Sequence, residues 1–268
     1  MAHTTSTPLA NSGDSKIDIT YIDHSGFAVV TPTAILVFDY FNDPTHSLPN
    51  LIKHNPGLPV YFLVSHHHYD HFNPDIFNLA QEAERVYVLS DDIKPQQVPD
   101  RIDAAWVRPG VTIDSLPGNI KVQAYGSTDV GVSFVVTLPS GQTIFHAGDL
   151  NYWHWNKEAT VDEVKRAYGR FVKVLQSIML DHKSLNVAFF PVDPRLGDDY
   201  ADGARLFLEN ILVDTFIPMH FWGDYKSGCD FDNYTTDNTD SFCLHIPGET
   251  LSLQGKMALR STDTIIAR

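Results

Sequence analysis

A dense group of histidines and one aspartate directly follows an apolar run in the first third of the sequence. Residues 65–71 read Ser-His-His-His-Tyr-Asp-His, which places five side chains of metal-ligand type within six positions. Imidazole and carboxylate groups are common protein ligands of divalent zinc, manganese and iron. In an extended segment, residues two apart point to the same side. His66 and His68 could therefore hold one ion, and Asp70 and His71 would present further ligands from the adjoining turn.

Histidine runs also arise from expression tags, from low-complexity tracts and by chance. A tag lies at a terminus, whereas this run lies inside the chain. The preceding residues 59–64 form the continuous apolar stretch expected of a strand buried on both faces. The following Asn73-Pro74-Asp75 is typical of a helix start, and it predicts a helix to about residue 84. A run between a strand and a helix favours a metal site over a tag, a low-complexity tract or a chance cluster.

Composition limits the classes of partner. The chain has 268 residues, 43% of them hydrophobic, which is enough for a sizeable core. It contains no run of about 18 apolar residues of the kind that spans a membrane. The formal net charge of −14 argues against nucleic acid and against an anionic membrane surface as partners, since both attract clustered Lys and Arg.

The N-terminal residues indicate a tail. Residues 1–16 are rich in Thr, Ser, Ala and Asn and lack the basic and apolar regions of a signal peptide. We expect 1–16 to be a disordered tail, 17–268 to be a single domain and the protein to be cytoplasmic. The only cysteines are Cys229 and Cys243; a disulfide between them is compatible with the sequence, but two cysteines do not make a disulfide scaffold.

Strands dominate the first half, and helices join them in the second. Apolar runs between turn residues predict strands at 17–21, 27–31, 34–38, 59–64 and 86–89, then hairpins at 112–124 and 132–146. A 3.6-residue apolar period predicts a helix over 161–180. Further predictions are a strand at 185–190, a helix at 201–210 and a strand at 215–219. This order favours a layered α/β protein with two mixed sheets covered by helices.

Two other strand ends carry metal-ligand side chains. Asp149 follows Ile-Phe-His-Ala-Gly, and His220 follows Phe-Ile-Pro-Met. Strand ends are where α/β folds gather functional side chains from distant parts of the chain. Taken singly, Asp149 could be a turn or cap residue and His220 a core histidine. With the histidine cluster, three such strand ends favour one shared site.

The pattern H-x-H-x-D-H, formed by His66, His68, Asp70 and His71, resembles the main motif of the metallo-β-lactamase-fold hydrolases. The resemblance extends over residues 17–223 and includes the segments 21–26, 145–149, 189–193 and 217–221. It is strongest to the bacterial metal-dependent hydrolases grouped with L-ascorbate-6-phosphate lactonase, and more remote to N-acyl-phosphatidylethanolamine phospholipase D. It implies the αββα four-layer sandwich of that fold, in which two mixed sheets are flanked by helices. It also implies one or two Zn²⁺, Mn²⁺ or Fe²⁺ ions per chain. The implied ligands are His66, His68, Asp70, His71, Asp149 and His220.

The sequence departs from the family at one ligand. Relatives carry a further metal-binding histidine before the Gly-Asp pair, whereas residues 124–134 here contain none. Another residue such as His146, Asp129 or Asp193 could complete that site. Alternatively the site could be weak, leaving one ion at Asp70, His71, Asp149 and His220, or catalysis could be reduced.

The expected activity is hydrolysis of a small ester, lactone or phosphodiester by metal-activated water. Asp70 would also orient that water, and His146 would contact substrate or donate a proton, or else pack behind the site. An alternative of another class is a metal-binding or sensory protein with reduced or lost catalysis. Redox chemistry at a di-iron site ranks last, because no second domain for an electron donor is evident.

Several features remain open to more than one interpretation. The aromatic residues of 151–155, with Phe221 and Trp222, could form a pocket wall or pack in the core. Arg195 could anchor an anionic group of a small-molecule substrate or form a surface ion pair. The polar segment 228–241 predicts a surface loop that could cap the site or contribute to a homo-oligomer.

Overall fold

The computed structural model describes residues 16–155 and 157–254, and these form two seven-stranded sheets. The first sheet has the order β14-β1-β2-β3-β4-β5-β6, and its strands β3 to β6 run parallel. Its strands are β1 (Ile17–Asp23), β2 (Gly26–Val30), β3 (Ile35–Phe38), β4 (Val60–Val64), β5 (Arg85–Ser90), β6 (Ala104–Val107) and β14 (Thr250–Leu253).

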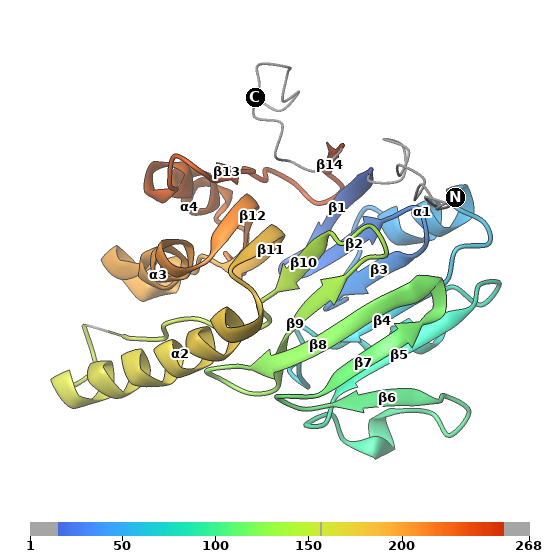
Figure 1. The fold of residues 1–268 in the computed structure, drawn as a ribbon, viewed down its shortest axis with the longest axis horizontal. Coiled ribbons are helices and arrows are strands. Elements are labelled where there is room, and N and C mark those ends of the chain that lie inside the picture. Colours follow the sequence, from blue (N-terminus) through green and yellow to red (C-terminus); the bar gives the residue numbers. More distant parts are fainter. Residues whose placement is uncertain (1–15, 156, 255–268) are drawn as a thin grey trace, which may run out of the picture.

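The second sheet has the order β13-β12-β11-β10-β9-β8-β7, and its strands β10 to β13 run parallel. Its strands are β7 (Thr112–Leu116), β8 (Ile120–Gly126), β9 (Val132–Thr137), β10 (Thr143–His146), β11 (Ser184–Pro191), β12 (Leu212–Met219) and β13 (Asp240–Ser241). Both sheets thus combine an antiparallel part with a parallel part, so many strand ends meet at one edge of the molecule (Figure 1).

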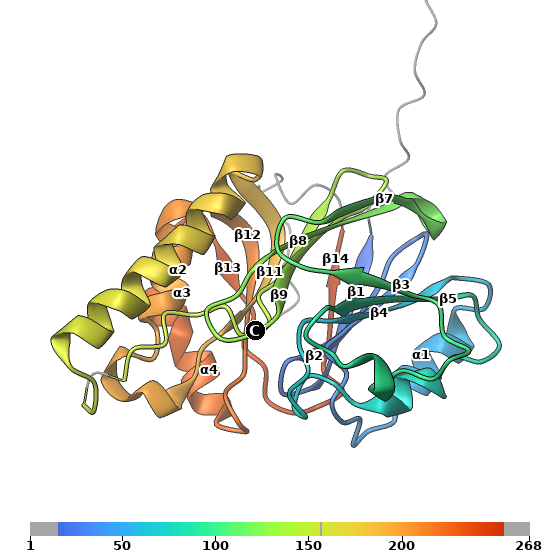
Figure 2. The ribbon, with the colours of Figure 1, turned by 90° about the horizontal axis from the view of Figure 1, so that it is seen from below.

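Helices cover the outer faces of the two sheets. They are α1 (Ser47–His54), α2 (Val161–Asp181), α3 (Asp202–Asn210) and α4 (Tyr225–Asp230), with short 3₁₀ turns η1 (Pro74–Phe77), η2 (Pro95–Gln97), η3 (Pro117–Asn119), η4 (Pro194–Asp199) and η5 (Phe231–Tyr234). Figure 2 shows α2, α3 and α4 outside the second sheet and α1 outside the first. The predicted αββα four-layer sandwich is confirmed.

Alternation along the central strands explains why the sheets stack. In β3, Leu36 and Phe38 join the main core, which includes the residues between the two sheets. Ile35 and Val37 of the same strand join a second apolar cluster, to which α1 contributes Leu48. Successive side chains of a strand point to opposite faces. A strand with apolar residues at every position therefore needs a layer on each side, as β3 has here.

The long helix α2 begins and packs as its sequence predicts. Thr160 accepts a hydrogen bond from the backbone N–H of Glu163 (3.3 Å), and the Glu163 carboxylate accepts one from the backbone N–H of Thr160 (2.7 Å). This reciprocal pair satisfies N–H groups that a helix start leaves free. Phe171, Leu175 and Ile178 are buried along one face, which fixes α2 on the second sheet.

Two predictions of local structure are wrong. The helix predicted to reach residue 84 is only the 3₁₀ turn η1, although Asn73 does cap it by accepting from the Asp75 N–H (2.9 Å). Ile76 and Phe77 are buried in the second apolar cluster, and Ala80 has φ 53°, which is incompatible with a continuing helix. The segment 228–241 is also more than a loop, since it contains the end of α4, then η5 and β13.

Other expectations are resolved or lie outside the described residues. Cys229 and Cys243 form a disulfide. The predicted tail lies outside the described residues except for Lys16, and the domain boundary remains a prediction. Among the described residues, no helix has the length and apolar character needed to cross a membrane.

Two glycines allow three loops to converge on Ser65, at the end of β4. Gly131 and Gly148 have φ values of 73° and 52°, which L side chains rarely adopt. A Cβ atom on Gly131 would lie 2.1 Å from the Ser65 carbonyl oxygen, and one on Gly148 would lie 2.7 Å from the Ser65 Cβ. The absence of side chains here brings the turn after β4 against the loops that precede β9 and follow β10.

We expect Gly131→Ala to lower the free energy of unfolding by about 3 kcal/mol or more, because backbone strain and a steric clash act together. Gly141→Ala is the matched control. Gly141 also has a positive φ (83°), but a Cβ there would meet nothing within 4 Å. Gly141→Ala should therefore lower the free energy of unfolding by about 1–2 kcal/mol, which is the cost of holding a residue other than glycine in the left-handed conformation. Urea unfolding of both variants checks the difference, and equal midpoints would show that the close approach to Ser65 contributes nothing.

Candidate metal centre

The ends of several strands from both sheets meet and present histidine and aspartate side chains. The residues are His24 after β1, Asp39 after β3, the 66–71 segment after β4, Asp129 after β8, Asp149 after β10, Asp193 after β11 and His220 after β12. All six residues predicted as ligands lie here, although four of them come from one six-residue segment and two are distant in sequence.

One cluster contains Asp70, His71, Asp149 and His220. The Oδ1 atom of Asp149 lies 3.1 Å from Nε2 of His71 and 3.3 Å from Nε2 of His220. The Oδ2 atom of Asp70 lies 3.9 Å from each of the same two nitrogens. Two ligand atoms at about 2.1 Å from one ion are at most about 4.2 Å apart. Each of these four separations is therefore compatible with two ligands of one ion, and ligand atoms of His24, Asp70, His71 and His220 all lie within 4.8 Å of one another.

A second cluster contains His66, His68, Asp129 and Asp149. Nε2 of His66 lies 3.0 Å from Nδ1 of His68 and 3.4 Å from Oδ2 of Asp149. Nδ1 of His68 lies 3.7 Å from Oδ2 of Asp129. Asp149 thus turns one carboxylate oxygen to each cluster, which is the arrangement of a ligand that bridges two ions.

Unsatisfied atoms show that these residues suit a cation. Four buried atoms at the first cluster have no hydrogen-bond partner within the described residues: Nε2 of His24, His71 and His220, and Oδ1 of Asp149. Buried polar atoms without partners cost free energy and are rare. All four can donate a lone pair, so a bound divalent ion would satisfy them together. The donor set of nitrogen and carboxylate oxygen suits zinc, manganese or iron.

The charges of the buried groups also indicate that the centre suits a divalent cation. Burial favours the neutral acid at Asp149, but His71 and His220 hold the pKa of its carboxyl well below the ordinary value. Burial would lower the pKa of His71, yet Asp149 and Asp39 raise it to about 10. The carboxylates thus draw a proton onto a buried imidazole when no ion is present. A divalent ion would supply that positive charge instead.

Groups behind the histidines fix which ring nitrogen faces the centre. The Nδ1–H of His71 donates to Asp39 (2.7 Å), and the Nδ1–H of His220 donates to Asp193 (2.9 Å). Asp39 also accepts from the Ser65 hydroxyl (2.6 Å), which in turn accepts from Nδ1–H of His66 (2.9 Å). Such partners orient metal-binding imidazoles and increase their basicity.

Sequence reasoning assigned no role to His24 or Asp39. The imidazole of His24 lies beside that of His220, with ring centroids 4.3 Å apart, and its Nε2 is 3.3 Å from Oδ2 of Asp70. Burial lowers the pKa of His24 to about 4, so this ring is neutral. His24, Asp39 and His220 all have positive φ values, a strain that concentrates at functional sites. The position of His24 is therefore suited to an additional ligand of the first cluster or to a group that contacts the substrate.

His146 lies behind the centre. Its ring is fully buried and stacks on Phe38, with centroids 5.0 Å apart and planes at 3°. Its Nε2–H donates to the Ser25 carbonyl (2.8 Å), and its Nδ1 accepts from the Gly148 N–H (3.2 Å). With both nitrogens engaged, this position supports the packing role rather than a direct contact with substrate.

The sequence offered His146, Asp129 and Asp193 as replacements for the metal-binding histidine that relatives carry, and the structure distinguishes among them. His146 is engaged as described, and Asp193 binds His220 and Arg195 from behind. Asp129 lies beside His68, within the stretch where relatives carry the histidine. Its side chain is 48% exposed, so the second cluster is more open to solvent than the first.

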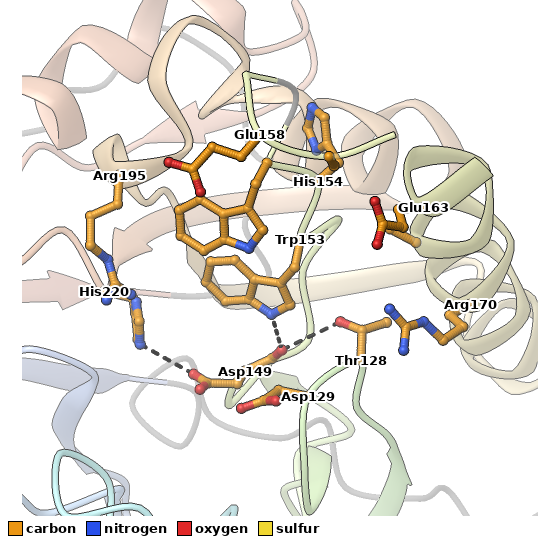
Figure 3. Close-up of a pocket in the computed structure, with 13 residues that line it drawn as sticks. Thr128, Asp129, Asp149, Trp153, His154, Glu158, Glu163, Arg170, Arg195 and His220 are labelled. Atoms are coloured by element: carbon orange, nitrogen blue, oxygen red, sulfur yellow. Dashed lines mark hydrogen bonds and ion pairs between the residues drawn. The ribbon is translucent and has the colours of Figure 1, made fainter. Parts of the chain in front are cut away.

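A cavity of about 540 Å³ opens onto the two clusters through Asp129, Asp149 and His220. Trp153 and Trp155 form part of its wall, with ring centroids 6.4 Å apart and planes at 13°. Figure 3 shows Trp153 above Asp149, whose backbone carbonyl accepts from the indole N–H (2.8 Å). Of the aromatic residues considered for a pocket wall, Trp153 and Trp155 line the cavity, whereas Phe221 is buried in the main core and Tyr152 packs against that core.

Two arginines also line the cavity. Arg195 makes a two-pronged ion pair with Asp193 and lies over the Trp222 ring, 5.1 Å from its centroid. Arg170, on α2, has no ion-pair partner among the described carboxylates. The cavity therefore combines aromatic surface, positive charge and the candidate metal centre.

Comparison with known proteins agrees with the fold. Residues 18–164 match the family described as a beta-lactamase superfamily domain. The chain belongs to this family. It is similar to a UPF0173 metal-dependent hydrolase from Anaeromyxobacter dehalogenans strain 2CP-C, with 24% identity over 232 residues covering 77% of this chain and 75% of the relative. A relative of the same description from Anaeromyxobacter sp. strain K is 25% identical over 229 residues.

Solved structures share the fold. Igni18, a metallo hydrolase from the archaeon Ignicoccus hospitalis, has a TM-score of 0.64 at 16% identity, over 90% of this chain and 100% of that one. The diiron β-hydroxylase CmlA from Streptomyces venezuelae has a TM-score of 0.61 at 11% identity, over 90% of this chain and 54% of that one. At these identities the likeness concerns the fold alone.

Proposed function

We propose that the protein is a hydrolase that uses one or two divalent metal ions to cleave a small ester, lactone or phosphodiester. The observation that carries the proposal is the position of Asp149 beside the cavity, where one carboxylate oxygen faces His71 and His220 and the other faces His66. The similar curated proteins are named metal-dependent hydrolases. Bound divalent ions supply two kinds of chemistry, because they lower the pKa of water and polarise the oxygen of the bond to be cleaved.

The side chains of this chain have distinct roles in the proposal. His66, His68 and Asp129 hold one ion, and Asp70, His71 and His220 hold the other, with Asp149 between them. Asp70 also accepts a hydrogen bond from the attacking water and so directs its lone pair at the substrate. Trp153 and Trp155 exclude solvent and contact the body of the substrate, while Arg170 or Arg195 binds an anionic group on it.

An anionic group on the substrate would bind best at Arg170. Asp129 and Asp149 would be neutralised by bound ions, and Arg195 is already paired with Asp193, while the wall also carries the carboxylates of Glu158 and Glu163. A cavity of about 540 Å³ lies within the range typical of small-molecule sites. A phosphorylated or carboxylated lactone meets these requirements, in keeping with the resemblance to the ascorbate-6-phosphate lactonase branch.

Metal removal tests the proposal. Chelator-treated protein should lose at least about 99% of its turnover of a lactone, carboxylic ester or phosphodiester probe, and Zn²⁺, Mn²⁺ or Fe²⁺ should restore it. Paired neutral and anionic lactones would test the role of the arginines through KM. Activity that survives complete metal removal would contradict the mechanism. Full metal loading with no turnover of any probe would support the alternative, a metal-binding protein without catalysis.

A further inference from the structure

A second group of metal-ligand side chains lies outside the centre described above. It consists of His154, in the loop after β10, Asp199 at the end of η4, and Asp202 at the start of α3. Figure 3 shows His154 at the end of the cavity lining away from Asp149 and His220. His154 lies in the same loop as Asp149, five residues further along the chain, whereas η4 and α3 supply none of the candidate ligands of the centre.

The hydrogen bonding of His154 fixes its tautomer. Nδ1 lies 2.6 Å from the backbone carbonyl oxygen of Tyr152. A carbonyl can only accept, so Nδ1 carries the proton. In the neutral ring, Nε2 then holds a lone pair. This atom is buried and has no hydrogen-bond partner in the part of the chain that the structure describes. The imidazole as a whole is 1% exposed, so water does not readily replace the missing partner.

Two carboxylates face this lone pair. Oδ2 of Asp199 and Oδ2 of Asp202 each lie 3.8 Å from Nε2 of His154, too far for a hydrogen bond. Both distances are below the separation of about 4.2 Å that two ligands of one ion can reach. The two side chains are 34% and 39% exposed, and Asp202 turns its other oxygen, Oδ1, to Nη1 of Arg205 at 3.6 Å. An unpartnered buried nitrogen facing carboxylates is the same signature found at His71 and His220.

We propose that His154, Asp199 and Asp202 bind a separate divalent cation, zinc or manganese, with water completing its coordination. One imidazole nitrogen and two carboxylate oxygens form a donor set that both ions accept. Tyr152 stacks on the His154 ring, with centroids 3.8 Å apart and planes at 15°, and so holds the ring in its orientation. The proposal concerns metal binding alone and does not depend on the proposed hydrolytic activity.

The cation would fasten the wall of the cavity. The loop of His154 also carries Trp153 and Trp155, and η4 carries Arg195. This loop already lies against α3, since a Cβ atom on Gly203 would come within 1.8 Å of the Asn151 Oδ1 atom. An ion shared by the loop, η4 and α3 would fix the aromatic wall relative to Arg195.

Metal counting on the purified chain tests the proposal. Wild-type protein saturated with zinc or manganese alone should retain one more ion than Asp199→Asn/Asp202→Asn, as measured by elemental mass spectrometry after gel filtration. Its thermal unfolding midpoint should also rise more on metal addition. Asp198→Asn is the matched control, because Asp198 adjoins the cluster in sequence but is 92% exposed and faces Lys157. It should retain the wild-type metal content.

Two further variants separate this site from the candidate centre. Asp149→Asn should lower the metal content of the centre, and adding the Asp199→Asn/Asp202→Asn pair should remove one more ion. His154→Gln should lose the same single ion, which excludes simple attraction of cations to surface carboxylates. Equal metal content in wild type and in Asp199→Asn/Asp202→Asn would overturn the proposal.

Discussion

Substitution Asp70→Ala should reduce kcat by about 10³-fold or more while the chain still folds. The side chain of Asp70 faces three imidazoles, with its Oδ2 atom 3.3 Å from Nε2 of His24 and 3.9 Å from those of His71 and His220. Its removal takes away both a proposed metal ligand and the group that would direct the attacking water. The measurement is steady-state turnover of the best probe at saturating metal.

Three comparisons make this result specific. Asp75→Ala removes an exposed carboxylate five positions along the chain and should leave turnover unchanged. Asp70→Asn keeps an oxygen ligand but not the charge; if it binds metal and stays inactive, the charge of Asp70 acts on the water itself. Far-UV circular dichroism of the metal-free proteins should show that Asp70→Ala still folds. Undiminished turnover in Asp70→Ala would contradict the mechanism.

The part of the site that could be predicted is the part encoded locally. His66, His68, Asp70 and His71 lie within six consecutive positions, so their pattern is visible without knowledge of the fold. Asp149 and His220 required one more step, namely that residues after buried strands collect at one edge, and the structure does bring them to the cluster.

The residues that were missed depend on contacts between distant segments. Asp39 follows β3 as an ordinary turn residue would, and its role appears only when Ser65 and His71 lie against it. In the sequence His24 likewise looks like an ordinary residue of the turn after a strand. Its role becomes evident only from the structure, in which His220, at the end of β12, lies beside it. No local periodicity reports such contacts.

In the fold, too, features encoded locally could be predicted, whereas features that depend on contacts between distant segments could not. The capping signal at Asn73 was correct, yet burial of Ile76 and Phe77 under the first sheet limited the helix to one turn. Strand β14 was not predicted because its pairing partner is β1, at the other end of the described chain. The paired layers were predictable because β4 is apolar at every position and needs cover on both faces.

Asp129→Ala should weaken binding of one of two ions by about 10-fold to 100-fold or more, because even the loss of groups behind the ligands costs this much. Asp129 lies where relatives carry a histidine, and its Oδ2 atom is 3.7 Å from Nδ1 of His68. In its absence His66, His68 and Asp149 would be the remaining ligands of that ion. Competition with a chelator of known affinity measures the two binding steps separately, and Asp103→Ala, which removes an exposed acid elsewhere, controls for the change in net charge.

Asp129→His supplies the complementary test. A neutral nitrogen at this position would recreate the histidine set of the family, so the weaker ion should bind more tightly than in wild type and not less. If Asp129→Ala instead keeps two tightly bound ions, Asp129 is no ligand and the second cluster must be completed from elsewhere. If wild type binds one ion and Asp129→His binds two, the aspartate is the reason that this chain uses a single ion. In that last case the metal count follows from one side chain, because the remaining ligands lie at the ends of strands that the rest of the fold holds in place.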